Sequence, residues 1–231
     1  MSRLKYLLVS FFIVGISFSQ NPTSSDLLEK AISYHDPDNN WSSFNGTLNI
    51  KLEMAEGPAR YSKVKINLPE ELFELRVIRD SVQTTYRINK ERCTTTITDS
   101  VNLRRKPCET AELYKNYYTY LYGLPMKLKD PGTIIDPVVS RKTFKGKEYL
   151  VLKVIYTEEV GSDVWYFYFD PETYAMEVYQ FYKGNPEAEG KNTGEYILLS
   201  GNKLINGINI PATRAWYYNK NDGYLGTDIL E

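Results

Sequence analysis

The sequence predicts a mainly β fold of the α+β class, in which a curved antiparallel sheet, or incomplete β-barrel, surrounds one helix. Short segments with alternating apolar and polar residues recur through most of the chain, and turn-forming residues separate them. The chain has no strand–helix–strand alternation, which favours antiparallel pairing. Residues 109–124 instead have helical periodicity and carry five tyrosines within nine residues. We expect this helix to lie in the concave side of the sheet.

Residues 1–19 have the pattern of a cleavable signal peptide. Basic residues precede an apolar run, Tyr6–Phe18, and Ser19 is a small residue suited to cleavage. The run is too short for a good membrane span, and no other stretch approaches the ~20 apolar residues that a span needs. No cysteine follows the cleavage site, so we expect no lipid anchor. These features predict an exported, periplasmic protein in which residues 20–231 form a single domain.

The first part of the mature chain predicts a short amphipathic helix followed by a meander of strands. The helix covers residues 26–34, where Asp26 and Glu29 have the spacing of a capping box. A turn-rich segment follows it. Alternating apolar and polar residues then predict strands at 44–54, 61–68, 72–79, 82–89 and 92–98, the last of them at an edge.

The central helix is apolar around most of its circumference. Thr110 is the expected N-cap, and Gly123 followed by Pro125 is the stop signal. Such a helix must be covered on more than one side. A buried tyrosine hydroxyl needs a partner or water, which suits a wet, half-open cavity. Two interpretations remain open: the rings fill a core, or they line a groove for an amphiphile.

The second half of the chain returns to strands. The sequence Asn206–Gly207 is the strongest hairpin signal, and Asp170–Thr173 has the composition of a β-turn. The segment Val164–Phe169 is apolar on both faces, so its outer face needs a cover or is available to a partner. The predicted strands are 134–144, interrupted at Pro137, and 149–157, 164–169, 174–182, 195–205, 208–218 and 224–230.

The chain contains two cysteines, Cys93 and Cys108. An even number in an exported chain favours a disulfide. The bond would close a loop of ~15 residues, worth on the order of 3 kcal/mol on the chain-entropy model, and would tie a strand to the central helix. Two thiols with no histidine nearby fall short of a zinc site.

Charge and motifs argue against several functions. The net charge is −1, so nucleic acid is not an expected partner. His35 lies near acidic residues, but the segment lacks the glycine and the distal glutamate of a calcium loop. The chain has no Gly-x-Ser-x-Gly elbow and no phosphate-binding glycine loop. We expect no catalytic residue, no metal and no cofactor. The basic run Arg104–Lys106 indicates either a solvated loop or a contact for anionic head groups.

Several segments resemble a family of exported bacterial proteins of unknown function. They are Tyr118–Gly132, Phe144–Leu152, Trp165–Tyr182 and Arg214–Tyr218, so the resemblance runs over nearly all of the mature chain. That family in turn resembles the lipoprotein-localisation-factor (LolA/LolB-like) superfamily. The resemblance implies an incomplete β-barrel with helices in its concave side, which holds acyl chains or lipidated proteins and has no catalytic residues.

We therefore predict a non-catalytic, monomeric carrier-like protein that holds an amphiphilic or acyl-bearing ligand between the sheet and the central helix. The expected partner is an apolar or amphiphilic small molecule or a lipidated protein. Two alternatives stay open: an envelope hydrolase with carboxylates that the sequence does not place, and a docking module with an aromatic outer face. The expected ligand-binding residues are Tyr114, Tyr117, Tyr118, Leu121, Met126, Trp165 and Phe167.

Overall fold

A computed structural model describes residues 22–79, 82–97 and 106–231, and within them thirteen strands form one antiparallel sheet. The predicted signal peptide and Arg104–Arg105 lie outside the described residues. The strands are β1 Asn45–Met54, β2 Arg60–Asn67, β3 Leu72–Arg79, β4 Val82–Asn89, β5 Arg92–Ile97, β6 Thr133–Ile135, β7 Ser140–Phe144, β8 Lys147–Tyr156, β9 Val164–Phe169, β10 Met176–Tyr182, β11 Glu195–Ile205, β12 Ile208–Tyr218 and β13 Tyr224–Leu230.

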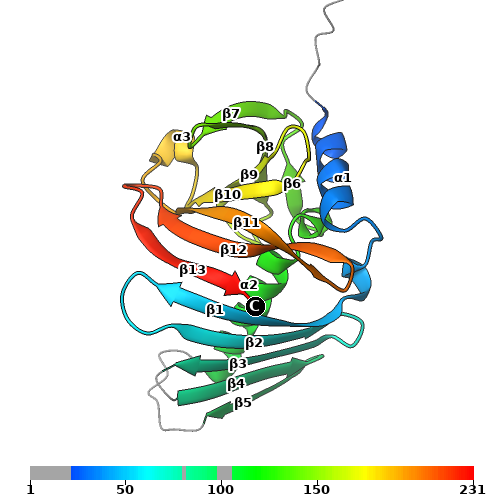
Figure 1. The fold of residues 1–231 in the computed structure, drawn as a ribbon, viewed down its shortest axis with the longest axis vertical. Coiled ribbons are helices and arrows are strands. Elements are labelled where there is room, and N and C mark those ends of the chain that lie inside the picture. The colour runs from blue at the N-terminus through cyan, green and yellow to red at the C-terminus, as the bar shows by residue number, and fades with distance from the viewer. Residues whose placement is uncertain (1–21, 80–81, 98–105) are drawn as a thin grey trace, which may run out of the picture.

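The sheet is open, and its order joins two meanders. The order is β5-β4-β3-β2-β1-β13-β12-β11-β10-β9-β8-β6, so the first meander meets the second where β1 pairs with β13. Strands β5 and β6 end this path, as expected for the edge position of β5. Figure 1 shows the sheet curving around the helix α2 (Pro107–Tyr122). The predicted curved, incomplete barrel is confirmed.

The extended segment predicted at 134–144 is in fact two strands, β6 and β7. Proline cannot donate to a strand ladder, and the break falls at Pro137. The Asp136 side chain accepts a hydrogen bond from the Val138 backbone at 2.9 Å, which turns the chain. Both strands then pair with β8, β6 along residues 154–156 and β7 along residues 147–151.

Strand alternation places one set of apolar side chains on the inner face, against α2. Helix α2 buries Ala111, Tyr118, Leu121 and Tyr122 against this face. In the view of Figure 1 the helix lies behind the central strands. The sheet contributes, among others, Leu48, Ile50, Val64, Ile66, Phe73, Leu75, Leu152, Val154, Phe167 and Phe169 to the same core.

Helix α2 begins earlier than the sequence predicted. Its first residue is Pro107, and Thr110 is not the N-cap, because the Thr110 hydroxyl donates to the Lys106 carbonyl at 3.2 Å. Proline at the first helical position costs no hydrogen bond, so Pro107 can start the helix. The Gly123 N–H closes the other end on the carbonyls of Thr119 and Tyr120. A side chain at Gly123 would meet the ring of Trp41 at 2.2 Å, so only glycine allows this close approach.

The N-terminal helix α1 (Ser24–His35) also begins before its predicted start. Thr23 is the N-cap, and its hydroxyl accepts from the Asp26 backbone N–H at 3.1 Å. Asp26 therefore lies in the first turn and is not itself the cap. A 3-10 turn, η1 (Trp41–Ser43), follows α1. Two further short helices are η2 (Met126–Lys129) and α3 (Pro186–Glu189).

The two-faced strands of the second meander are covered on their outer face as well. Trp165, Phe167 and Phe169 belong to the inner cluster, while Val164, Tyr166 and Tyr168 belong to a second one, as parity predicted. Phe144 of β7 packs against this outer cluster. Its buried members are Tyr149, Val151, Val164, Tyr166, Tyr168, Val178 and Tyr182, so this face is a second small core.

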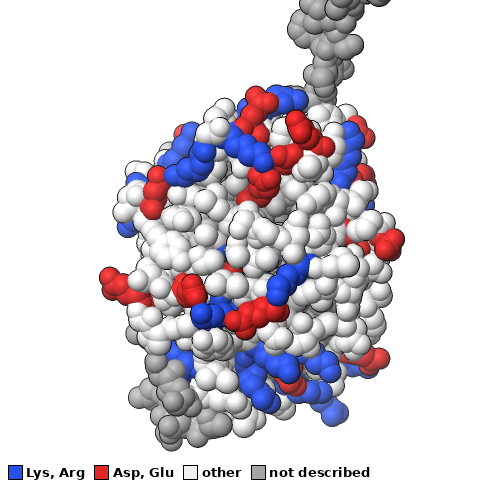
Figure 2. Space-filling view, in the orientation of Figure 1, with Lys and Arg blue, Asp and Glu red and all other residues white. Residues whose placement is uncertain are grey.

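The outer face of the first meander is polar and basic. Lys63 and Arg76 face each other across β2 and β3, and Lys65 faces Glu74 on the same side. Figure 2 shows Lys and Arg gathered over β2, β3 and β4 in the lower part of the view. This face is solvated, in contrast to the outer face of the second meander.

The predicted turns have the expected geometry. Asn206 and Gly207 have φ of 50° and 78°, the left-handed values that a two-residue hairpin of this type requires. The Asp170 carboxylate accepts from the backbone N–H groups of Glu172 and Thr173, which fixes the turn between β9 and β10.

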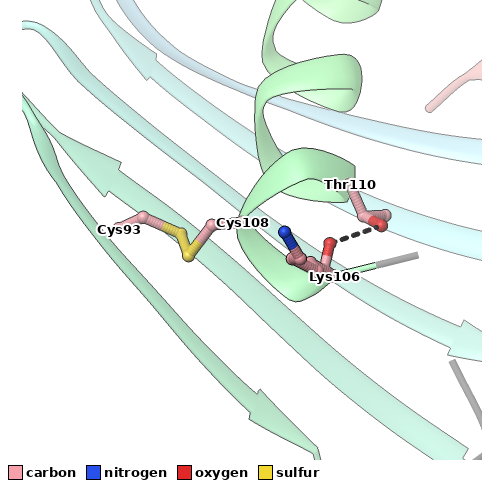
Figure 3. The surroundings of a disulfide bond; sticks show 4 residues. All are labelled: Cys93, Lys106, Cys108 and Thr110. Atoms are coloured by element: carbon pink, nitrogen blue, oxygen red, sulfur yellow. Dashed lines mark hydrogen bonds between the residues drawn. A yellow bond between two sulfur atoms is a disulfide. The ribbon is translucent and has the colours of Figure 1, made fainter.

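Cys93 of β5 and Cys108 of α2 form a disulfide, as predicted (Figure 3). Their sequence separation is 15 residues. The bond fixes the N-terminal turn of α2 to the edge strand of the sheet. This link is valuable because an edge strand has a neighbour on one side only.

We predict that the double variant C93A/C108A loses about 3 kcal/mol of unfolding free energy, because the loop closed by the disulfide no longer restricts the unfolded chain. Urea unfolding followed by circular dichroism measures the loss. The wild-type protein in dithiothreitol is the matched control and should show the same midpoint as the variant. Equal midpoints for the variant and the oxidised wild type would contradict the prediction.

His35 fastens α1 to two strands of the second meander. The imidazole is 1% exposed. Nδ1 donates to the Asn209 carbonyl at 2.7 Å, and Nε2 accepts from the Met176 backbone N–H at 3.0 Å. This pattern requires the neutral ring, and burial lowers the pKa of His35 to about 4, although the Asn209 hydrogen bond opposes the shift.

We predict that His35 makes folding stability depend on pH between about 4 and 6.5. The folded pKa is depressed, so the stabilisation is complete above the unfolded value of 6.5 and is lost as pH falls towards 4. The full effect is about 3 kcal/mol from the pKa difference. Urea unfolding at a series of pH values should show a shallower pH dependence for H35Q than for the wild type. Parallel profiles for the two proteins would refute this assignment.

Candidate functional site

Four residues form a row across the inner face of the sheet, which we call the charged row. Arg214 of β12 faces Asp228 of β13, Asp228 faces Leu52 of β1, and Leu52 faces Arg60 of β2. The strand pairing alone therefore places two arginines and one aspartate in line. Helix α2 crosses over this row.

Asp228 is the acid of the charged row and is 2% exposed. Its Oδ2 accepts from Trp216 Nε1 at 3.0 Å, and the nearby Tyr117 hydroxyl favours the charged form of the carboxyl and lowers its pKa. Its Oδ1 has no partner among the described residues. Burial raises the pKa of the Asp228 carboxyl, although Arg214 and Arg60 act in the opposite direction.

Arg214 joins the sheet to the C-terminal end of α2. Its side chain is 1% exposed, and Nη1 donates to the Pro211 carbonyl at 3.0 Å. Nη2 reaches the Leu121 carbonyl of α2 at 3.5 Å. The guanidinium carbon lies 3.8 Å from the centroid of the Tyr122 ring, a cation–π contact. These contacts hold the buried cation in place, although its Nε has no partner among the described residues.

Arg60 ends the row at the other side and is half-buried. Its Nη2 donates to the Tyr118 hydroxyl at 3.4 Å, and that hydroxyl donates to Ser62 Oγ at 3.3 Å. The Nε of Arg60 has no partner among the described residues. Burial raises the pKa of the Tyr118 hydroxyl, so the partner that Arg60 has is a neutral group.

A pocket of about 350 Å³ lies between α2 and the charged row, and we call it the α2 pocket. Apolar side chains make most of its wall. Met54 and Leu113 are 38% and 50% exposed, so apolar groups reach solvent at its rim. The complete lining is Leu52, Met54, Arg60, Leu113, Tyr114, Tyr117, Trp216, Leu225, Gly226 and Asp228.

Aromatic contacts hold the wall of the α2 pocket in place. The ring of Tyr117 stacks on Trp216 with centroids 6.1 Å apart, and Tyr114 packs against Tyr86 at 5.5 Å. Burial raises the pKa of Tyr117 well above its usual value. Its hydroxyl is therefore a neutral donor beside Asp228. The pocket thus combines an apolar wall with a few polar groups, the usual composition of ligand sites.

The structure distributes the predicted ligand-binding residues between this pocket and the core. Tyr114 and Tyr117 line the α2 pocket. Trp165 is half-buried between Tyr120 and Phe181, away from it. The remaining predicted residues, Tyr118, Leu121, Met126 and Phe167, are buried in the inner core.

Sequence reasoning missed the polar part of the site. Arg214 and Asp228 lie in the apolar phase of their strands, where an ionisable side chain is unusual. An ionisable residue at an apolar position of a strand is a signal from which the polar part of the site could have been predicted. Arg60 lies at the first position of β2, where a basic residue looks like part of the preceding turn.

A second hollow of about 550 Å³ lies beside β6 and the end of β8. Ile134 and Ile155 face each other there and are 47% and 41% exposed. Its charged groups, Asp136, Lys153 and Asp163, are all half-buried. No residue of its lining is a buried charged group, so we regard the α2 pocket as the candidate site.

The described residues contain no cluster of three or more His, Cys, Asp or Glu side chains suited to a metal ion. His35 is engaged at both nitrogens, and Asp36 accepts from the backbone N–H groups of Asn40 and Trp41. None of the helices described in the structure has the length and apolarity needed to cross a membrane.

The open sheet with a helix in its concavity defines the class of the protein: it has the LolA-like fold. A LolA superfamily protein from Nitrosomonas europaea superposes with a TM-score of 0.54 at 10% identity, over 91% of this chain and 92% of that chain. A DUF1329 family protein from Desulfovibrio piger gives a TM-score of 0.51 at 8% identity, over 90% of each chain. At these identities the likeness concerns the fold.

The chain belongs to the family of unknown function DUF6503, whose model matches residues 3–230. This agrees with the resemblance to an uncharacterised family seen in the sequence. No curated protein matches the chain. The α2 pocket and the charged row are therefore the evidence from which a function must be argued.

We predict that D228A loses about 3 kcal/mol of unfolding free energy, because the substitution leaves Arg214 buried without its acidic neighbour. D228N keeps an acceptor for Trp216 and should lose less. Chemical unfolding of the two variants measures the difference. T227A is the control, since Thr227 is the half-buried neighbour on the opposite face. A D228A variant as stable as T227A would show that the charged row contributes nothing to folding.

Proposed function

We propose that the chain is an exported, non-catalytic binding protein that holds the apolar part of an amphiphilic ligand in the α2 pocket. The observation that carries this proposal is the pocket itself: an apolar wall that opens at Met54 and Leu113 and ends on the charged row. Apolar surface of this kind gains free energy when a hydrocarbon chain displaces water from it. The LolA-like fold supports a carrier role as an analogy of architecture.

The size of the pocket favours a small ligand. A volume of about 350 Å³ is near the lower end of the range of ligand sites, roughly 300–1,000 Å³. It suits one short hydrocarbon chain or the end of a longer one. We therefore place a single-chain amphiphile ahead of a lipidated protein, whose several acyl chains would need more space.

The arrangement of acids gives no support to the hydrolase alternative. A glycosidase-type mechanism needs two carboxyl groups facing the substrate, and the lining of the α2 pocket contains Asp228 alone. His35 has both ring nitrogens in hydrogen bonds to the backbone, so it is not available as a base. The docking alternative is weakened too, because the aromatic residues of the outer face are buried, with Phe144 of β7 and Leu198 of β11 packed against them.

The proposed periplasmic localisation rests on the sequence and on the disulfide. The N-terminal segment has the pattern of a signal peptide, and the Cys93–Cys108 bond suits an oxidising compartment such as the periplasm. We propose that the mature protein works there as a monomer. Size-exclusion chromatography with light scattering tests the oligomeric state.

Native mass spectrometry of the protein purified from its own envelope tests the proposed function. We expect a bound species that organic solvent removes and that a single-chain amphiphile restores. The proposal would be overturned if the spectrum showed nothing but the mass of the free chain and the protein took up neither decanoate nor decanol.

We predict that L113E lowers the affinity for a fluorescent fatty-acyl probe at least tenfold, because a charge at the rim must be desolvated when the chain binds. Fluorescence titration measures the affinity. L204E is the matched control: Leu204 is 75% exposed in β11 and does not line the pocket. Leu113 is 50% exposed, so both variants should fold. Equal affinities for L113E and L204E would place ligand binding elsewhere.

A further inference from the structure

The charged row contains one more positive than negative charge. Arg214 faces Asp228 on the adjacent strand, but neither arginine of the row makes an ion pair with Asp228 among the described residues. Arg60 is two strands away from Asp228, with Leu52 between them, a backbone separation of about 10 Å at the usual strand spacing. Of the two arginines, Arg60 is the one that lines the α2 pocket and can reach a bound ligand.

The groups within hydrogen-bond distance of Arg60 carry no charge, and Asp228 acts on it only from further away. Arg60 donates a hydrogen bond to the hydroxyl of Tyr118 on α2. That hydroxyl donates in turn to Ser62, which lies on the same strand as Arg60. The other nearby phenols, those of Tyr114 and Tyr117, carry no charge at neutral pH. None of the described acids lies within ion-pair distance of Arg60. Its Nε is buried and without a partner in the described part of the chain.

We propose that Arg60 binds the carboxylate head group of a single-chain amphiphile whose hydrocarbon chain occupies the α2 pocket. This inference rests on the proposed function and adds the chemical class of the ligand. The planar guanidinium matches a carboxylate in shape and charge, and hydrogen bonds between charged partners are stronger than neutral ones. The head group would supply both the missing negative charge and an acceptor for the free N–H.

The other classes of head group fit less well. An alkylammonium group would be placed beside a cation that already lacks an adjacent acid. A hydroxyl could accept a hydrogen bond from Arg60 but would leave its charge uncompensated in an apolar wall. Asp228 does not exclude a carboxylate at Arg60, because Arg214 faces Asp228 directly and lies on its far side from Arg60.

The test compares decanoate, decanol and decylamine, which share a chain length and differ in head-group charge. Each ligand displaces a fluorescent acyl probe from the mature, oxidised protein at neutral pH. We expect decanoate to bind roughly tenfold more tightly than decanol, and decylamine to bind most weakly. In R60Q the preference for decanoate over decanol should disappear, while decanol affinity stays within about twofold of the wild type.

Arg76→Gln is the matched control variant. Arg76 is exposed on the outer face of β3. The R76Q substitution changes the net charge of the protein by the same amount as R60Q. We expect R76Q to keep the preference for decanoate. Should R60Q fold poorly, decanoate labelled with ¹³C at the carboxyl carbon gives a second measurement on the wild type. Its bound pKa should lie below that of free decanoate, because Arg60 favours the charged form.

The outcomes separate this inference from the proposed function. Equal binding of decanol and decanoate by the wild type, or a preference for decanoate that R60Q retains, overturns the role of Arg60 and leaves a chain-binding protein. No binding of any of the three ligands overturns the proposed function and this inference together. A decanoate preference that R60Q abolishes and R76Q keeps supports both.

Discussion

The strand register that places Asp228 opposite Arg214 under α2 is the constraint on which the site depends. Asp228 stands on β13, the strand that joins the two meanders, and Arg214 stands on the neighbouring β12. Arg214 also contacts the last turns of α2 through the Leu121 carbonyl and the Tyr122 ring. These two facing residues thus connect the strand order, the position of the helix and the base of the pocket. Burying charged groups costs desolvation, so their value here lies in position more than in net stability.

The tyrosines of α2 fit this arrangement because each ring covers apolar surface while its hydroxyl is available to a polar partner. The Tyr118 hydroxyl accepts a hydrogen bond from Arg60, and the Tyr117 hydroxyl lies near Asp228. A leucine at either position would cover the sheet but would leave the charged row without these partners. The Tyr122 ring covers the guanidinium of Arg214, although its hydroxyl has no partner among the described residues. The polar groups of the pocket are therefore concentrated at one end of it.

Local patterns in the sequence predicted the strands, the hairpins and the central helix, because alternation, turn residues and periodicity are local properties. They misplaced the start of α2, since Thr110 looked like a cap while Pro107 already fitted the first helical position. They did not predict that β1 pairs with β13, a contact between opposite ends of the chain. The charged row depends on that pairing. Arg60 and Asp228 could not be recognised as one site from residues so distant in sequence.

The tyrosine-rich helix has two different faces, one that fills the core and one that lines a pocket, and the binding of an amphiphile in that pocket stays a prediction. Ala111, Tyr118, Leu121 and Tyr122 fill the inner core, whereas Leu113, Tyr114 and Tyr117 line the α2 pocket. The disulfide at Cys108 holds the start of the helix at the sheet edge, and Arg214 holds its end. A helix fixed at both ends but only partly covered between them keeps apolar surface at a stable opening. Because the charged row lies directly beneath that opening, the apolar wall and the charged groups of the pocket meet at the same place.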